Sequence, residues 1–443
     1  MIESIFNRHK ASLPSVDIMA SKVNVTFNIL LISVAIILGN IVRLQGIPLN
    51  NQQKKYLGYT KESLLNFTEL SEHYGYMSEE HTVLTDDGYF LTIFRINSKK
   101  CLGKMKKPPV ILMHGLLLSS DAFLDAGPGA GLGFLLSDSC YDLWIGNQRG
   151  NYYARRHIRL NPDKDPDFWQ FSVDEIGLYD IPAIIDYVLK YTKEKKLNYI
   201  GYSQGAGTFL IMCSERPGYC DKVNILIGLA PAARQTHSRS VPYRLVAQYI
   251  MQMERVFYDT GFHEFLAKGS LSQEFLEFFC QFTSISETVC GTGEALFDSF
   301  HPGSITNKTL RAMFGHFPAG TSIHNMARYG QSMKSPLFQK FDYGKIKNLE
   351  LYGNEQPPSY NLSAVTIPFM VLYGKNDHLV DTKDIYWLIK KVPNVLEAKE
   401  VSNPLWNHFD VAYSQYNRKL LLPKINEYLL KYSRVVKNLA TFL

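Results

Sequence analysis

Short apolar runs with β character alternate with helical patterns along most of the chain. Several runs are continuously apolar, as strands buried on both faces of a sheet are. The alternation predicts an α/β fold with a mostly parallel sheet flanked by helices. The expected strands are Tyr89–Ile96, Pro109–Met113, Tyr141–Ile145, Asn198–Tyr202, Asn224–Leu229, Ile367–Tyr373 and Glu397–Val401. Between Asp180 and Thr192 the apolar residues follow helical spacing, and we expect Asp180 to cap this helix.

The pattern changes between about Ser238 and Gly330, where aromatic-rich helical sequence replaces the strands. A chain of 443 residues also exceeds the usual length of one domain, about 100–200 residues. We therefore expect a core in two parts, residues 50–237 and 331–443, with an inserted, mainly helical cap over residues 238–330.

The N-terminal segment, residues 1–45, is expected to be a signal peptide or a signal-anchor. Its apolar run Ile29–Leu38 has ten residues, the length of a signal core. A membrane-spanning helix of about 20 residues would have to extend over Val23–Val42 and so include several polar side chains. Cleavage predicts a secreted or lysosomal protein. Retention predicts a single-pass protein that associates with a membrane through residues 23–42.

Composition excludes several classes of protein. The 47 Lys and Arg against 41 Asp and Glu leave a net charge of +6 that is spread along the chain, so a nucleic-acid partner is not expected. Six cysteines without a CxxC pair indicate neither a disulfide scaffold nor a zinc site. Cys280 and Cys290 could close a small loop in an oxidising compartment. Asn66, Asn307 and Asn361 begin glycosylation triplets that matter only on the secretory route.

The segment that carries chemistry is Asn198–Gly207, in which a β run enters Gly201-Tyr-Ser-Gln-Gly205 and leaves into helix-compatible sequence. This pattern places a serine at a sharp strand-to-helix turn, where its hydroxyl is exposed for attack. The sequence therefore predicts Ser203 as a nucleophile; the structural alternative is an ordinary turn serine.

A serine nucleophile needs a base and an acid that orients the base, in the chain order serine, acid, histidine on this kind of fold. Asp377 follows the predicted strand Ile367–Tyr373, and His408 follows the last predicted strand. We expect Asp377 to be the acid and His408 the base. Asp381 is the rival acid but could cap a helix that begins near Thr382, and His378 lies too close to Asp377 in sequence.

An oxyanion intermediate needs backbone donors. Pro109–Met113 ends in His114-Gly115, the place where this architecture supplies one N–H, and the residue after the nucleophile supplies the other. Leu116 and Gln204 are the expected donors, with a simple turn at His114-Gly115 as the structural alternative.

Motifs spread along the chain resemble the acid lipases, the family of gastric lipase, lysosomal acid lipase and insect secreted lipases, on the α/β-hydrolase fold. The similar segments, which occur in the family's order, are Gly75–Ile96, His114-Gly-Leu-Leu, Gly146-Asn-Gln-Arg-Gly-Asn151, Phe168–Glu175, Tyr179-Asp-Ile-Pro-Ala183, Gly201-Tyr-Ser-Gln-Gly205 and Pro318-Ala-Gly-Thr-Ser322. The resemblance extends over about Ser71 to Tyr428. Tyr202 departs from it, because the family usually has histidine there.

The resemblance implies a triad of Ser203, Asp377 and His408, oxyanion donors at Leu116 and Gln204, a lid-bearing cap, and a cap disulfide between Cys280 and Cys290. It implies a monomeric lipase that needs no cofactor and hydrolyses neutral lipid, triacylglycerol or steryl ester, at a lipid–water interface. The alternatives are a carboxylesterase or thioesterase of the same fold, or a catalytically silent lipid-binding protein.

Overall fold

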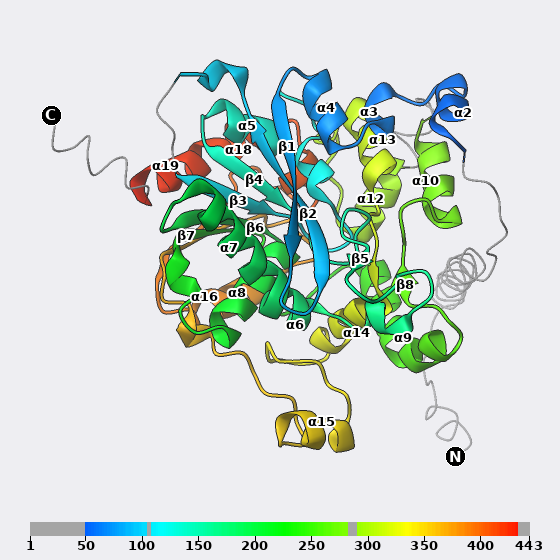
Figure 1. Ribbon diagram of the computed structural model, residues 1–443, viewed down its shortest axis with the longest axis vertical. Coiled ribbons are helices and arrows are strands. Elements are labelled where there is room, and N and C mark those ends of the chain that lie inside the picture. Colours follow the sequence, from blue (N-terminus) through cyan, green and yellow to red (C-terminus); the bar gives the residue numbers. More distant parts are fainter. Residues whose placement is uncertain (1–48, 104–107, 282–289, 433–443) are drawn as a thin grey trace, which may run out of the picture. The chain divides into compact units, whose positions relative to one another are not determined.

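A nine-stranded sheet forms the centre of the part of the chain that the computed structural model describes, residues 49–103, 108–281 and 290–432 (Figure 1). Its order is β1-β2-β4-β3-β6-β7-β10-β11, and β5 pairs with β2. The strands are β1 Met77–Leu84, β2 Tyr89–Asn97, β3 Pro109–Met113, β4 Asp142–Gly146, β5 Arg156–His157, β6 Leu197–Tyr202, β7 Val223–Leu229, β10 Phe369–Tyr373 and β11 Val395–Glu400.

The neighbouring strands β4-β3-β6-β7-β10-β11 are parallel, whereas β2 pairs antiparallel with β1, β4 and β5. The strands β3, β6 and β10 are buried along their whole length, which agrees with their apolar sequences. The prediction of a mostly parallel sheet flanked by helices is confirmed, with strand ends shifted by one or two residues. All the parallel strands present their carboxyl ends at one edge, where ligands bind on open α/β sheets.

The strand β1 was missed by the sequence analysis. Seven of its eight residues, all except Val83, are at least partly exposed, and most of them, such as Glu79 and Glu80, are charged or polar. The apolar alternation of a half-buried strand is therefore absent. Its pairing with β2 supplies the backbone hydrogen bonds that place it at the sheet edge.

Helices cover both faces of the sheet. Figure 1 shows α5, α18 and α19 gathered together and α6, α7 and α8 gathered apart from them. The helices outside the cap region are α2 Asn51–Tyr56, α3 Lys61–Leu64, α4 Phe67–His73, α5 Leu132–Asp138, α6 Val173–Glu175, α7 Ile181–Thr192, α8 Gln204–Glu215, α15 Lys345–Tyr352, α16 Thr382–Ile389, α17 Asp410–Tyr413, α18 Asn417–Leu420 and α19 Leu422–Tyr432.

The stretch expected to form the cap is mainly helical in its described residues. It contains α9 Val241–Asp259, α10 Leu271–Gln281, α12 Gly291–Phe297, α13 Asn307–His316 and the start of α14 Ile323–Ser332. It also contains β8 Glu264–Phe265 and β9 Thr321–Ser322, which pair antiparallel. Strands of two residues are too short to produce a period in the sequence, which explains why they were not predicted.

The expectation that Asp180 caps a helix is wrong. Helical backbone begins upstream, at Val173 of α6, and continues through Asp180 into α7, and Asp180 makes no side-chain cap bond. Its carboxylate instead accepts hydrogen bonds from Nε and the backbone N–H of the buried Arg149, at 2.8 and 2.9 Å. Arg149 also donates to Asp87 at 2.6 Å. A buried cation with two carboxylates therefore joins the β1–β2 turn, the end of β4 and the start of α7.

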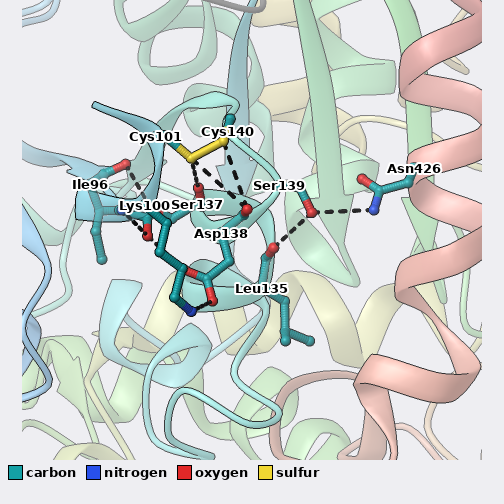
Figure 2. The surroundings of a disulfide bond; sticks show 10 residues. Ile96, Lys100, Cys101, Leu135, Ser137, Asp138, Ser139, Cys140 and Asn426 are labelled. Atoms are coloured by element: carbon teal, nitrogen blue, oxygen red, sulfur yellow. Dashed lines mark hydrogen bonds and ion pairs between the residues drawn. A yellow bond between two sulfur atoms is a disulfide. The ribbon is translucent and has the colours of Figure 1, made fainter. Parts of the chain in front are cut away.

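Disulfides join all six cysteines of the chain, in the pairs Cys280–Cys290, Cys101–Cys140 and Cys213–Cys220. The first was anticipated, and the other two were not. Figure 2 shows Cys101–Cys140 beside the end of α5, where Lys100 pairs with Asp138 at 2.6 Å. This bond ties the connection after β2 to the turn after α5, a contact that sequence spacing does not reveal.

The predicted N-terminal signal, residues 1–45, lies outside the described residues. Among the described ranges, no helix combines the length and apolar character that a membrane crossing requires. Of the predicted glycosylation acceptors, Asn66 and Asn361 are exposed and Asn307 is half-buried.

Candidate active site

Ser203 occupies the turn between β6 and α8 in a backbone conformation that is strained for any residue with a Cβ, φ 52° and ψ −117°. Its N–H donates to the Leu229 carbonyl on the neighbouring strand at 2.9 Å, which holds the turn against the sheet. The two motif glycines are required by close approach. A Cβ on Gly201 would lie 2.5 Å from the Ala206 Cα, and one on Gly205 would lie 2.5 Å from the Met113 carbonyl oxygen.

Asp377 lies in the loop after β10, residues 374–381, which we call the acid loop. One carboxylate oxygen accepts N–H bonds from Leu379 at 2.9 Å and Val380 at 2.7 Å. The other lies 2.6 Å from Nδ1 of His408. With both oxygens used, the carboxylate of Asp377 is fixed against this one imidazole.

His408 lies in the loop after β11, residues 401–409, which we call the histidine loop. The imidazole is buried. Burial alone would lower the pKa of His408, but Asp377 and, to a smaller extent, Asp298 raise it above the ordinary value of 6.5. With Nδ1–H directed at Asp377, Nε2 is the ring nitrogen left to exchange a proton.

The residue before the serine connects it to the histidine. Tyr202 is buried, its hydroxyl donates to the His408 carbonyl at 2.8 Å, and the two rings lie 5.1 Å apart. The structure thus brings Ser203, Asp377 and His408 to the same edge of the sheet.

The rival residues have other partners. Asp381 caps α16, as the alternative anticipated, by accepting from the Lys383 N–H at 2.9 Å, and it also pairs with Arg239 at 2.8 Å. The backbone of His378 is held by Arg239 and by Asp298, whose carboxylate accepts its N–H at 2.8 Å.

The chain after β3 lies over the serine. A Cβ on Gly115 would lie 3.0 Å from the Ser203 Cβ and 3.4 Å from its Oγ. His114 is buried, burial lowers its pKa to about 4, and Nε2 accepts from the Gln148 N–H at 3.1 Å. The neutral ring must then carry its proton on Nδ1, which donates to the Gly115 carbonyl at 2.8 Å and fixes the peptide that bears the Leu116 N–H.

Gln204 is the first residue of α8, so its N–H has no acceptor within the helix. Its side chain is clamped from three directions. Nε2 donates to Gln148, and Oε1 accepts from Asn325 at 3.0 Å and from the Tyr329 hydroxyl at 2.9 Å. Sequence reasoning missed these clamping residues. Two segments that resemble the family could have pointed to them. Gly146–Asn151 contains Gln148, and Pro318–Ser322 ends shortly before Asn325.

Two family models match the chain. The first, described as a partial alpha/beta-hydrolase lipase region, covers residues 67–127, and the second, described as the alpha/beta hydrolase fold, covers residues 108–413. The second match spans the serine turn, the acid loop and the histidine loop.

Curated relatives align over most of their length. Lipase 1 of Drosophila melanogaster is 39% identical over 84% of this chain and 81% of its own. Human gastric triacylglycerol lipase is 36% identical over 80% of this chain and 88% of its own, and human lipase member K is 33% identical over 81% and 88%.

Proposed function

Because the chain belongs to the α/β-hydrolase lipase family, we propose that it is a lipase that hydrolyses carboxylic esters of neutral lipids with Ser203, His408 and Asp377 as its catalytic residues. The observation that carries the proposal is the 2.6 Å bond between Asp377 and His408, together with a strained turn at Ser203 whose preceding residue, Tyr202, bonds the His408 carbonyl. Relatives named as triacylglycerol lipases support the substrate class.

The proposed reaction proceeds through an acyl-enzyme. Ser203 Oγ attacks the ester carbonyl carbon while Nε2 of His408 takes the hydroxyl proton. The N–H groups of Leu116 and Gln204 would hold the oxyanion. The intermediate collapses, the alcohol leaves with the proton from His408, and the acyl group remains on Ser203. Water, deprotonated by His408, then releases the fatty acid.

Exposed apolar side chains in the cap region support a lipid substrate. Four of them are among the most exposed large apolar residues there: Val241 on α9 at 58%, Phe275 on α10 at 61%, Leu296 on α12 at 63% and Phe300 after it at 65%. We propose that they belong to a contact surface for an apolar partner, since large exposed apolar patches mark such surfaces. We propose that this region meets the lipid–water interface.

The disulfides support passage through the secretory route, since such bonds persist in oxidising compartments. We propose a secreted or lysosomal destination after cleavage within residues 1–45. N-terminal sequencing of the mature protein tests this, and an intact Met1 or Ile2 would contradict it.

A hydrolysis panel tests the substrate class. Emulsified triolein, cholesteryl oleate and a short soluble ester are compared at several pH values. Faster hydrolysis of either emulsified lipid is expected. Hydrolysis of the short ester alone would identify a carboxylesterase, and a protein inactive on all three but able to bind lipid would be a silent member of the family.

A further inference from the structure

The sheet does not by itself fix the distance between the acid and the histidine. The strands β10 and β11 are paired up to Tyr373 and Glu400, but Asp377 lies four residues beyond the first and His408 eight residues beyond the second. Loops of this length need additional contacts to hold two side chains at 2.6 Å.

Those contacts come from Asp298 and Ser299, the two residues after α12, which we call the clasp. One carboxylate oxygen of Asp298 accepts the His378 N–H at 2.8 Å, and the other accepts the His408 N–H at 2.5 Å and the Phe409 N–H at 3.2 Å. A single buried carboxylate therefore bonds the backbone next to the acid and the backbone of the base itself.

Ser299 repeats the pattern one residue later. Its hydroxyl donates to the Asn376 carbonyl, and its own carbonyl accepts from the Asn407 side chain at 2.7 Å. Consecutive residues thus each bridge the acid loop and the histidine loop, independently of the sheet.

The cost of burying this carboxylate indicates its importance. Burial and the nearby Asp377 raise the pKa of Asp298, while the backbone N–H groups and His408 oppose that rise. A second carboxyl so close to Asp377 would be unfavourable if it only filled space, since an asparagine or an apolar side chain would avoid the repulsion.

We propose that Asp298 is a positioning residue for the hydrolysis, which holds the backbones of the acid loop and the histidine loop so that Asp377 and His408 meet. This role rests on the proposed function. An asparagine at this position presents one acceptor and one donor. The backbone N–H of one of the two loops would therefore face the amide NH2 group and lose its acceptor. Both oxygens are therefore needed.

The test compares purified full-length Asp298→Asn with the wild type on a soluble ester and in the rate of Ser203 labelling by a fluorophosphonate. The expected result is a fall in kcat and in labelling rate of at least about tenfold with KM unchanged, in protein whose circular dichroism matches the wild type. Asp342→Asn is the matched control, because that carboxylate accepts a backbone N–H, from Gly344 at 2.9 Å, before α15 and bonds neither the acid loop nor the histidine loop. It should retain wild-type kcat.

Wild-type kcat in Asp298→Asn would overturn the role of Asp298. If that variant does not fold, Asp298→Glu decides, because it keeps the carboxylate but displaces it by one methylene. A lower kcat with unchanged KM supports the proposal, and full kcat overturns it. A wild-type protein that neither hydrolyses an ester nor takes up the phosphonate contradicts the proposed function itself.

Discussion

Tyr202 departs from the family pattern without removing a proposed catalytic group. The resembling family usually has histidine before the serine, and here a buried tyrosine bonds the His408 carbonyl and places its ring against the imidazole. No proposed catalytic group is lost. The Tyr202 hydroxyl instead adds one contact to the support of His408, beside those from Asp377 and Asp298.

Replacing Tyr202 by phenylalanine removes that hydroxyl and keeps the ring. Because a neutral hydrogen bond contributes about 0.5–1.5 kcal/mol, kcat for a soluble ester should fall roughly 3- to 10-fold with KM unchanged. The control is Tyr243→Phe, a buried tyrosine of α9 whose hydroxyl bonds Gln235 at 2.6 Å. It should keep wild-type kcat, and equal kcat in all three proteins would contradict the account.

The raised pKa of Glu294 predicts how the stability of the protein depends on pH. Burial, with Asp298 and Asp410 nearby, raises its pKa to about 9 from an ordinary 4.5. Between those values the folded chain keeps a proton that the unfolded chain releases. Its contribution to stability is therefore fully present below pH 4.5 and is lost as the pH rises toward 9.

Glu294→Gln cannot ionise and keeps an acceptor for Asn407. Urea unfolding should show that this variant gains at least about 1 kcal/mol over the wild type between pH 5 and pH 8. Glu350→Gln, a change at an exposed residue of α15, should have the same free energy of unfolding as the wild type at pH 5 and at pH 8. If Glu294→Gln kept the wild-type dependence of stability on pH, Glu294 would not be the cause of the loss of stability at higher pH.

At the scale of elements, Arg149 links the chain after β4 to Asp180, the residue that precedes α7. Its partner Asp180 is fully buried, and burial raises the Asp180 pKa to about 6 in spite of the arginine. Such a pair is costly to form, but breaking it leaves an unpaired buried charge, which is costlier still.

Arg149→Met should lower the free energy of unfolding by about 3–5 kcal/mol in urea titrations. The double variant Arg149→Met with Asp180→Leu should recover part of that loss, because it removes the fully buried one of the two carboxyls that lose the arginine. Arg255→Met, which breaks an exposed pair with Asp259, should change stability by less than about 1 kcal/mol. No recovery in the double variant would contradict the interpretation.

The burial of each strand decides whether its sequence pattern could predict it. The apolar runs of β3, β6 and β10 locate buried strands, and the turn at Ser203 follows directly from its glycines. The edge strand β1 has no apolar alternation, and the Cys101–Cys140 pair bridges segments 39 residues apart. Patterns of local sequence carry information on local burial but not on which distant segments meet.

In the molecule as a whole, the proposed catalytic residues lie in turns and loops at the carboxyl ends of parallel strands. Chain order predicted which acid and which histidine face each other, because the order of the strands fixes where their loops lie. The clasp and the clamp on Gln204 could not be predicted in this way. Apart from Gln148, their residues come from the cap region, and their partners are backbone groups and amide side chains without a distinctive spacing.

The central claim is that Ser203 is the nucleophile of an ester hydrolase. The most direct measurement treats the wild type and Ser203→Ala with a fluorophosphonate, maps the labelled residue by mass spectrometry and follows hydrolysis of emulsified triolein. We expect one label on Ser203, loss of that label and a fall in hydrolysis of at least about 10³-fold in the variant, and equal urea unfolding of both proteins. A label on another residue, or undiminished hydrolysis in Ser203→Ala, would contradict the account.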